Sequence, residues 1–156
     1  MGSDRFLSLV LKWSMPLTSF QSRKLRDACE QHGVRLIIGY GSRIHGVPAS
    51  TEESDFDLGV VDDQPRWTGE RHRLITSALE GVWPDHPLDV VHLNAVDLLL
   101  RVEALARGEL LYGDLLTFDE YRLLTIRLYK DQEDLRQLEV CLIDKKLDRL
   151  TALLNG

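Results

Sequence analysis

The sequence predicts an α/β (α+β) protein with one small mixed β-sheet, flanked by helices and followed by C-terminal helices. Three observations lead to this prediction. Apolar segments of strand length alternate with helical segments as far as about residue 113. Residues that cap helices stand at the expected starts and ends of these segments. Leucines then recur at helical spacing from about residue 114 onward.

The first half of the chain is divided by capping signals and short apolar runs. Thr18 and Gln21 have the spacing of a capping box, and Gly33 is placed to end the helix, so we expect a helix from Thr18 to His32. The following elements are expected in chain order: a strand over 34–38, a strand over 55–61, a helix from Thr68 to about Gly81, a strand over 88–93, a helix that ends at Gly108, and a short strand or turn over 109–112.

Two further capping signals lie in the second half. Asn94 together with Asp97 is expected to cap the helix that ends at Gly108. Residues 117–120 have the pattern of a second capping box, and helical spacing continues from there to near residue 154, with a break near residues 130–134. Leucines along this last segment approximate an apolar stripe.

Length and charge limit the classes of function. We expect one domain over residues 1–156, with 1–17 as an N-terminal extension and 114–156 as C-terminal helices. The net charge of -6 disfavours a broad nucleic-acid interface, so nucleic acid is not expected as a direct partner. The two cysteines lack the spacing of metal ligands, which favours reduced thiols in a cytoplasmic protein. The apolar run over residues 6–13 is too short to cross a membrane, and no membrane association is expected.

A pair of acidic residues in the second expected strand has the arrangement of ligands for a divalent cation. Asp55 and Asp57 are two residues apart, so both carboxylates should point to the same face of the strand. Two adjacent like charges repel each other unless a cation lies between them. Carboxylate oxygens suit magnesium, which commonly takes one or two carboxylates plus phosphate oxygens. The neighbouring Asp62 and Asp63 are interpreted instead as part of a solvated acidic loop.

A glycine-serine pair after the first expected strand supplies the other half of the candidate site, a position that suits a phosphate. A short helix is expected to begin at Ser42, and free N–H groups at a helix start suit a phosphate. Gly41 would allow close approach of the backbone, and Arg43 could neutralise phosphate charge. Tyr40 is either a packing residue or a neighbour of the nucleotide.

The third acidic residue is Asp89, in the otherwise apolar strand 88–93. A charge in such a strand is costly unless it is paired or metal-bound, so a metal ligand and a salt bridge are the two interpretations. Asp89 should share its face with Val91 and Leu93, and His92 should face away from it as a structural residue.

This combination resembles a known superfamily. Gly41-Ser42, then Asp55 and Asp57 two residues apart, then Asp89 on a later strand, is similar to the pattern of the DNA polymerase β-type nucleotidyltransferases. The chain length and the run from Gly41 to Val61 resemble the minimal nucleotidyltransferase (MNT) group. The resemblance covers about residues 20–113.

The resemblance implies a nucleotidyltransferase fold and a set of roles. It implies that Gly41 and Ser42 bind the triphosphate of ATP, and that Asp55 and Asp57 bind magnesium, as two ions. It also implies that Asp89 completes the metal site and activates the attacking hydroxyl. The loop between Ser42 and Asp55 has twelve residues, longer than is usual in the group, which bears on how the triphosphate or acceptor fits.

The resemblance also implies a partner. Many MNT proteins are antitoxins encoded beside a HEPN toxin, and active members transfer AMP from ATP to a tyrosine of that toxin. A protein adenylyltransferase of this kind is therefore expected. Two alternatives stay open: an antitoxin that neutralises its toxin by binding alone, and a nucleotidyltransferase that acts on small molecules such as aminoglycosides. The sequence leaves open whether the chain forms homo- or hetero-oligomers.

Overall fold

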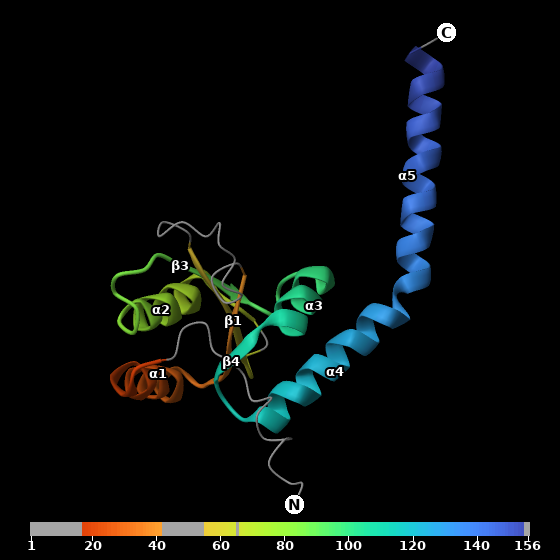
Figure 1. Ribbon diagram of the computed structural model, residues 1–156. Coiled ribbons are helices and arrows are strands. Elements are labelled where there is room, and N and C mark those ends of the chain that lie inside the picture. The colour runs from red at the N-terminus through yellow and green to blue at the C-terminus, as the bar shows by residue number, and fades with distance from the viewer. Residues whose placement is uncertain (1–16, 42–54, 65, 155–156) are drawn as a thin grey trace, which may run out of the picture.

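A four-stranded mixed sheet lies at the centre of the protein (Figure 1). The computed structural model describes residues 17–41, 55–64 and 66–154. The strands are β1 (Val34–Tyr40), β2 (Phe56–Asp62), β3 (Leu88–His92) and β4 (Glu109–Tyr112). Their order in the sheet is β3-β2-β1-β4. β1 pairs antiparallel with both β2 and β4, whereas β2 and β3 are parallel, so the predicted mixed sheet is confirmed.

Helices cover both faces of the sheet. The helices are α1 (Ser19–His32), α2 (Gly69–Glu80), α3 (Leu98–Arg107), α4 (Leu115–Asp131) and α5 (Glu133–Leu154). Residues of α1 and α2 pack with one face of the sheet in a first core cluster, around Leu58 and Trp83. Residues of α3 and α4 pack with the other face in a second cluster, around Leu36 and Leu93. The alternation of side chains along the strands supplies apolar residues to both clusters.

Most of the expected helix boundaries are confirmed. Both hydrogen bonds of the capping box are present between Thr18 and Gln21, and Gly33 ends α1 in the left-handed conformation with φ of 62°. Thr68 caps α2 by accepting a hydrogen bond from the backbone N–H of Arg71. The cap of α3 is Asp97 by itself. Asn94 instead accepts a hydrogen bond from the Tyr121 hydroxyl at 2.6 Å.

The predicted capping box over residues 117–120 is wrong. α4 begins at Leu115, and its N-cap is Asp114. The carboxylate of Asp114 accepts a hydrogen bond from the backbone N–H of Thr117 at 2.8 Å, so Thr117 lies inside the first turn. The predicted break is confirmed, because α4 ends at Asp131 and α5 begins at Glu133.

α5 projects away from the sheet and the other helices (Figure 1). It has no buried residue, so its leucines join neither core cluster. The apolar stripe predicted from the sequence therefore faces solvent. In the part of the chain that the structure describes, no helix has the length and apolar character needed to cross a membrane.

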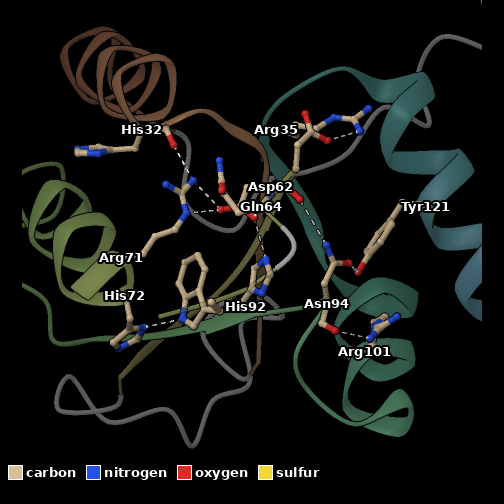
Figure 2. Close-up of polar contacts among 12 residues, drawn as sticks. His32, Arg35, Asp62, Gln64, Arg71, His72, His92, Asn94, Arg101 and Tyr121 are labelled. Atoms are coloured by element: carbon tan, nitrogen blue, oxygen red, sulfur yellow. Dashed lines mark hydrogen bonds and ion pairs between the residues drawn. The ribbon is translucent and has the colours of Figure 1, made fainter. Parts of the chain in front are cut away.

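A buried carboxylate joins several elements on the side of the sheet covered by α1 and α2. Asp62 was expected in a solvated acidic loop, but its side chain is fully buried, so that prediction is wrong (Figure 2). Arg71 of α2 donates to its Oδ2 atom at 2.7 Å, and Nε2 of His92 lies 3.1 Å from its Oδ1 atom. Arg71 also donates to the carbonyl oxygen of His32 at the end of α1, at 2.7 Å. Asp63, by contrast, is exposed as expected and pairs with Arg35 at 2.9 Å.

His92 lies in the same contact network, as expected for a structural residue. It is buried on the face of the sheet opposite Asp89, and the Trp67 ring stacks on it with 4.4 Å between ring centroids. Its Nδ1 atom is buried and has no hydrogen-bond partner in the part of the chain that the structure describes. Burial lowers the pKa of His92 from its ordinary value of 6.5, although the charge of Asp62 opposes this.

Asp62→Asn should lower the free energy of unfolding by about 3 kcal/mol, because it leaves the guanidinium of Arg71 without its carboxylate in a buried setting. Urea unfolding checks this. The matched control is Asp63→Asn, which breaks an exposed pair and should cost less than about 1 kcal/mol. Equal losses in the two variants would contradict the assignment of Asp62 as a structural centre.

The stability of the protein should fall as the pH drops below about 7, and His92 should account for part of that fall. Because the pKa of His92 is lowered in the folded protein, the unfolded chain binds the proton first as the pH decreases. Urea unfolding between about pH 8 and about pH 5 measures the slope. His92→Gln should reduce it, and an unchanged slope would rule out this source.

Candidate active site

Asp57 and Asp89 lie side by side at one end of the sheet. They are paired in register across the parallel strands β2 and β3. Paired residues on neighbouring strands point to the same face, so the two carboxylates share a face. A hydrogen bond of 2.9 Å from the backbone N–H of Phe56 to the carbonyl oxygen of Pro87 fixes the two strands next to this pair. Leu93 lies further along the same face, in the core cluster that α3 covers.

The surroundings of Asp57 make ionisation of its carboxyl group less favourable. Burial raises the pKa of Asp57 above its ordinary value, and the charges of Asp89 and Asp55 raise it further. Asp57 is half-buried, whereas Asp55 and Asp89 are exposed. None of the ion pairs found among the described residues involves these three side chains. A cation that binds between them would relieve this repulsion.

Gly41 touches the carboxylate of Asp57. It follows β1 directly and has a φ of 82°, a conformation that favours glycine. A Cβ atom at Gly41 would collide with Oδ2 of Asp57. The missing side chain therefore leaves room for the carboxylate, a role that sequence reasoning did not assign to Gly41. The signal was a glycine at the end of a strand, but its partner became visible only when β1 and β2 were paired.

Tyr40 forms one side of the same region. It is paired in register with Asp57 across β1 and β2 and packs on the cluster beneath α3. Burial raises the pKa of Tyr40 to about 12, and the charges of Asp57 and Asp89 contribute. The phenol is therefore neutral at physiological pH. Tyr40 packs on the core beside the carboxylates. The predicted Ser42 and Arg43, and the helix expected to begin there, lie outside the described residues.

The carboxylates at this end of the sheet can supply some, but not all, of the oxygen ligands that magnesium needs. Among the residues that the structure describes, no three Asp, Glu, His or Cys side chains are grouped closely enough to hold a metal ion by themselves. Magnesium commonly uses one or two carboxylates and completes its coordination with water and phosphate oxygens. Asp57 and Asp89, with the adjacent Asp55, supply oxygens of this kind. The chemistry of the residues therefore fits a metal that binds together with a nucleotide.

The sequence matches the family model described as polymerase beta, nucleotidyltransferase, over residues 23–114. This span contains Asp55, Asp57 and Asp89 as well as Gly41. The chain belongs to this nucleotidyltransferase family. No curated protein matches the chain.

Solved structures with a similar fold come from toxin–antitoxin complexes. One, described as a toxin–antitoxin with AMP-PNP, has a TM-score of 0.64 at 19% identity, covering 78% of this chain and 97% of that chain. A structure of the MntA-HepT pair has a TM-score of 0.61 at 18% identity, covering 81% and 98%. A complex of a tri-AMPylated Shewanella oneidensis HEPN toxin with an MNT antitoxin has a TM-score of 0.60 at 18% identity, covering 80% and 96%. At these identities the similarity shows a shared fold.

Gly41→Ala should weaken binding of ATP with magnesium roughly tenfold, because the new methyl group displaces the carboxylate of Asp57. Isothermal titration calorimetry measures this affinity. The matched control is Gly33→Ala, since Gly33 also has a positive φ, of 62°, but a Cβ atom added there would have no neighbouring atom within 4 Å.

Both alanine variants should lose about 1 kcal/mol of stability from the strained backbone conformation. Only Gly41→Ala should also lose affinity. The role of Gly41 beside Asp57 is disproved if the two variants bind ATP and magnesium equally well.

Proposed function

We propose that the chain is a magnesium-dependent nucleotidyltransferase of the MNT type, which transfers AMP from ATP to a hydroxyl group of a HEPN-type toxin. The observation that carries this proposal is the pairing of Asp57 with Asp89 in register on one face of the sheet. Family membership supports nucleotidyl transfer as the reaction class. The fold shared with an MNT antitoxin in complex with a tri-AMPylated HEPN toxin supports the choice of donor and acceptor.

The exposure of the acidic residues suggests different roles for them in metal binding and in contact with the acceptor. Asp57 is half-buried and feels the charges of Asp89 and Asp55, which suits a residue that holds a metal. Asp89 is exposed on the edge strand β3, where the hydroxyl of a protein acceptor can approach it. Two magnesium ions would neutralise charge on the triphosphate and lower the pKa of the attacking hydroxyl.

The transfer is a single displacement at the α-phosphorus. The acceptor oxygen forms a bond to the α-phosphorus of ATP while the bond to the oxygen that bridges the α- and β-phosphorus atoms breaks, and pyrophosphate leaves. Asp89 would receive the proton of the acceptor hydroxyl. Gly41 keeps the carboxylate of Asp57 in place, and Ser42 and Arg43 are proposed to bind the phosphates.

Asp57→Asn should reduce AMP transfer at least about a hundredfold and leave the fold intact. The assay uses α-³²P-labelled ATP, magnesium and the product of the adjacent gene, which the proposal expects to be a HEPN-type toxin. Asp63→Asn, an exposed carboxylate paired with Arg35, is the matched control and should retain transfer. Full transfer by Asp57→Asn would refute the metal assignment. Binding of the toxin without transfer by the wild-type chain would favour neutralisation by contact alone.

Asp57→Asn should also be more stable than the wild-type chain when no metal is present. The raised pKa of Asp57 means that ionisation of this carboxylate is less favourable in the folded state than in the unfolded state. Its contribution to stability therefore falls as the pH rises through that raised pKa. Asparagine carries no charge, so the melting temperature at pH 7 should rise. A lower melting temperature would show that Asp57 stabilises the fold.

A further inference from the structure

α5 carries a large apolar surface that the described part of the chain leaves uncovered. The helix has 22 residues and is about 33 Å long. Its apolar residues lie between 48% and 86% exposed: Leu135, Leu138, Val140, Leu142, Ile143, Leu147, Leu150, Leu153 and Leu154. Exposed apolar surface on this scale is characteristic of an interaction site.

These residues form two stripes. Val140, Ile143, Leu147, Leu150 and Leu154 are spaced three and four residues apart and form one continuous stripe, here called the arm stripe. Leu135, Leu138 and Leu142 form a second stripe, roughly 120° around the helix from the first. A single partner helix covers one narrow stripe. Two stripes therefore require a partner that presents at least two neighbouring helices.

The arm stripe runs into a cavity at the bend between α4 and α5. The cavity has a volume of about 590 Å³, and Val140 lines it as well as beginning the arm stripe. Val102 of α3 and Ile126 of α4 provide further apolar walls. A side chain that projects from a docked helix could fill this cavity, as anchor residues do in the centres of interfaces.

Arg136, which lines the cavity, carries a positive charge that no ion pair among the described residues neutralises. The guanidinium of Arg136 lies over the ring of Tyr129, at 3.6 Å from the centroid. Its Nη1 atom is buried and has no hydrogen-bond partner within the described residues. Lys130 and Glu133 line the same cavity, but no ion pair is found between Glu133 and Arg136. A carboxylate on the docked protein would satisfy Arg136, and Lys130 would add to the attraction.

The charges beside the arm stripe disfavour a second copy of this chain as the occupant. In a parallel pair of α5 helices, Glu139 of one copy would lie beside Asp144 of the other. In the antiparallel register that pairs Val140 with Leu150, Asp144 would meet Asp144 and Lys146 would meet Lys146. Both arrangements bring like charges together.

We propose that the arm stripe, the second stripe and the cavity at Arg136 together dock the protein that accepts AMP, through two adjacent helices that carry apolar side chains and a carboxylate. The identity of this occupant rests on the proposed function, whereas the surface and the chemistry required of it follow from α5 and the cavity. α5 contains none of the three acidic residues of the candidate active site, so docking and AMP transfer can be tested separately.

The experiment measures, by calorimetry, binding of the purified product of the adjacent gene, which the proposed function expects to be a HEPN-type toxin. The test variants are the double substitution Ile143→Asp with Leu147→Asp, and the charge reversal Arg136→Glu. The matched controls are Ala152→Asp and Lys145→Glu, which make the same kinds of change on the opposite side of α5. The double variant should raise the dissociation constant roughly thirtyfold or more, and both test variants should bind ATP and magnesium like the wild-type chain.

The outcomes separate the two proposals. Tight binding by the double variant, equal losses in the controls, or no binding by the wild-type chain would each overturn the docking surface. Light scattering that shows a dimer of the chain alone, converted to a monomer by the double variant, would assign the surface to a second copy and also overturn it. Binding that the test variants weaken, without AMP transfer by the wild-type complex, would support the docking surface and defeat the proposed function.

Discussion

The parallel pairing of β2 with β3 is the constraint on which the acidic site depends. It places Asp57 directly beside Asp89, so main-chain hydrogen bonds hold two like charges next to each other. Their mutual repulsion is an energetic cost that the ladder and the surrounding core must offset. Burial contributes most to the raised pKa of Asp57, and the charge of Asp89 raises it further. Under the proposed function, a sheet that fixes this pair before a ligand arrives would be preorganised for a cation and for the phosphates that accompany it.

β2 carries a second acidic residue with the opposite physical character. Asp57 and Asp62 are five positions apart, so their side chains point to opposite faces of the sheet. Asp62 is fully buried: Arg71 neutralises its charge, and Nε2 of His92 lies within hydrogen-bond distance, so Asp62 is tied to α2 and β3. Among the described residues, the charges that act on the pKa of Asp57 are those of two other carboxylates, Asp89 and Asp55. The difference separates an acid whose charge is paired within the fold from an acid whose charge no described side chain neutralises.

The sequence predicted those features that depend on neighbours along the chain. Alternation within the strand 55–61 placed Asp57 correctly, and the spacing of Thr18 and Gln21 predicted the start of α1, because both signals act over a few residues. The burial of Asp62 could not be predicted in this way. Its partner His92 lies thirty residues further along the chain, and only the pairing of β2 with β3 brings the two together. For the same reason, leucine spacing predicted that α5 is a helix but not that it leaves the core.

The separation of the acidic site from α5 bears on how one small chain could combine binding with chemistry. If the arm stripe supplies affinity for the acceptor, the residues around Asp57 and Asp89 do not need to bind the acceptor strongly before it reacts. Interactions remote from the reacting atoms raise the local concentration of the acceptor hydroxyl, while only contacts that strengthen in the transition state accelerate transfer. Binding would then neutralise a toxin by contact, and transfer of AMP would follow within the same complex. Loss of the carboxylates would abolish the transfer of AMP and leave neutralisation by contact.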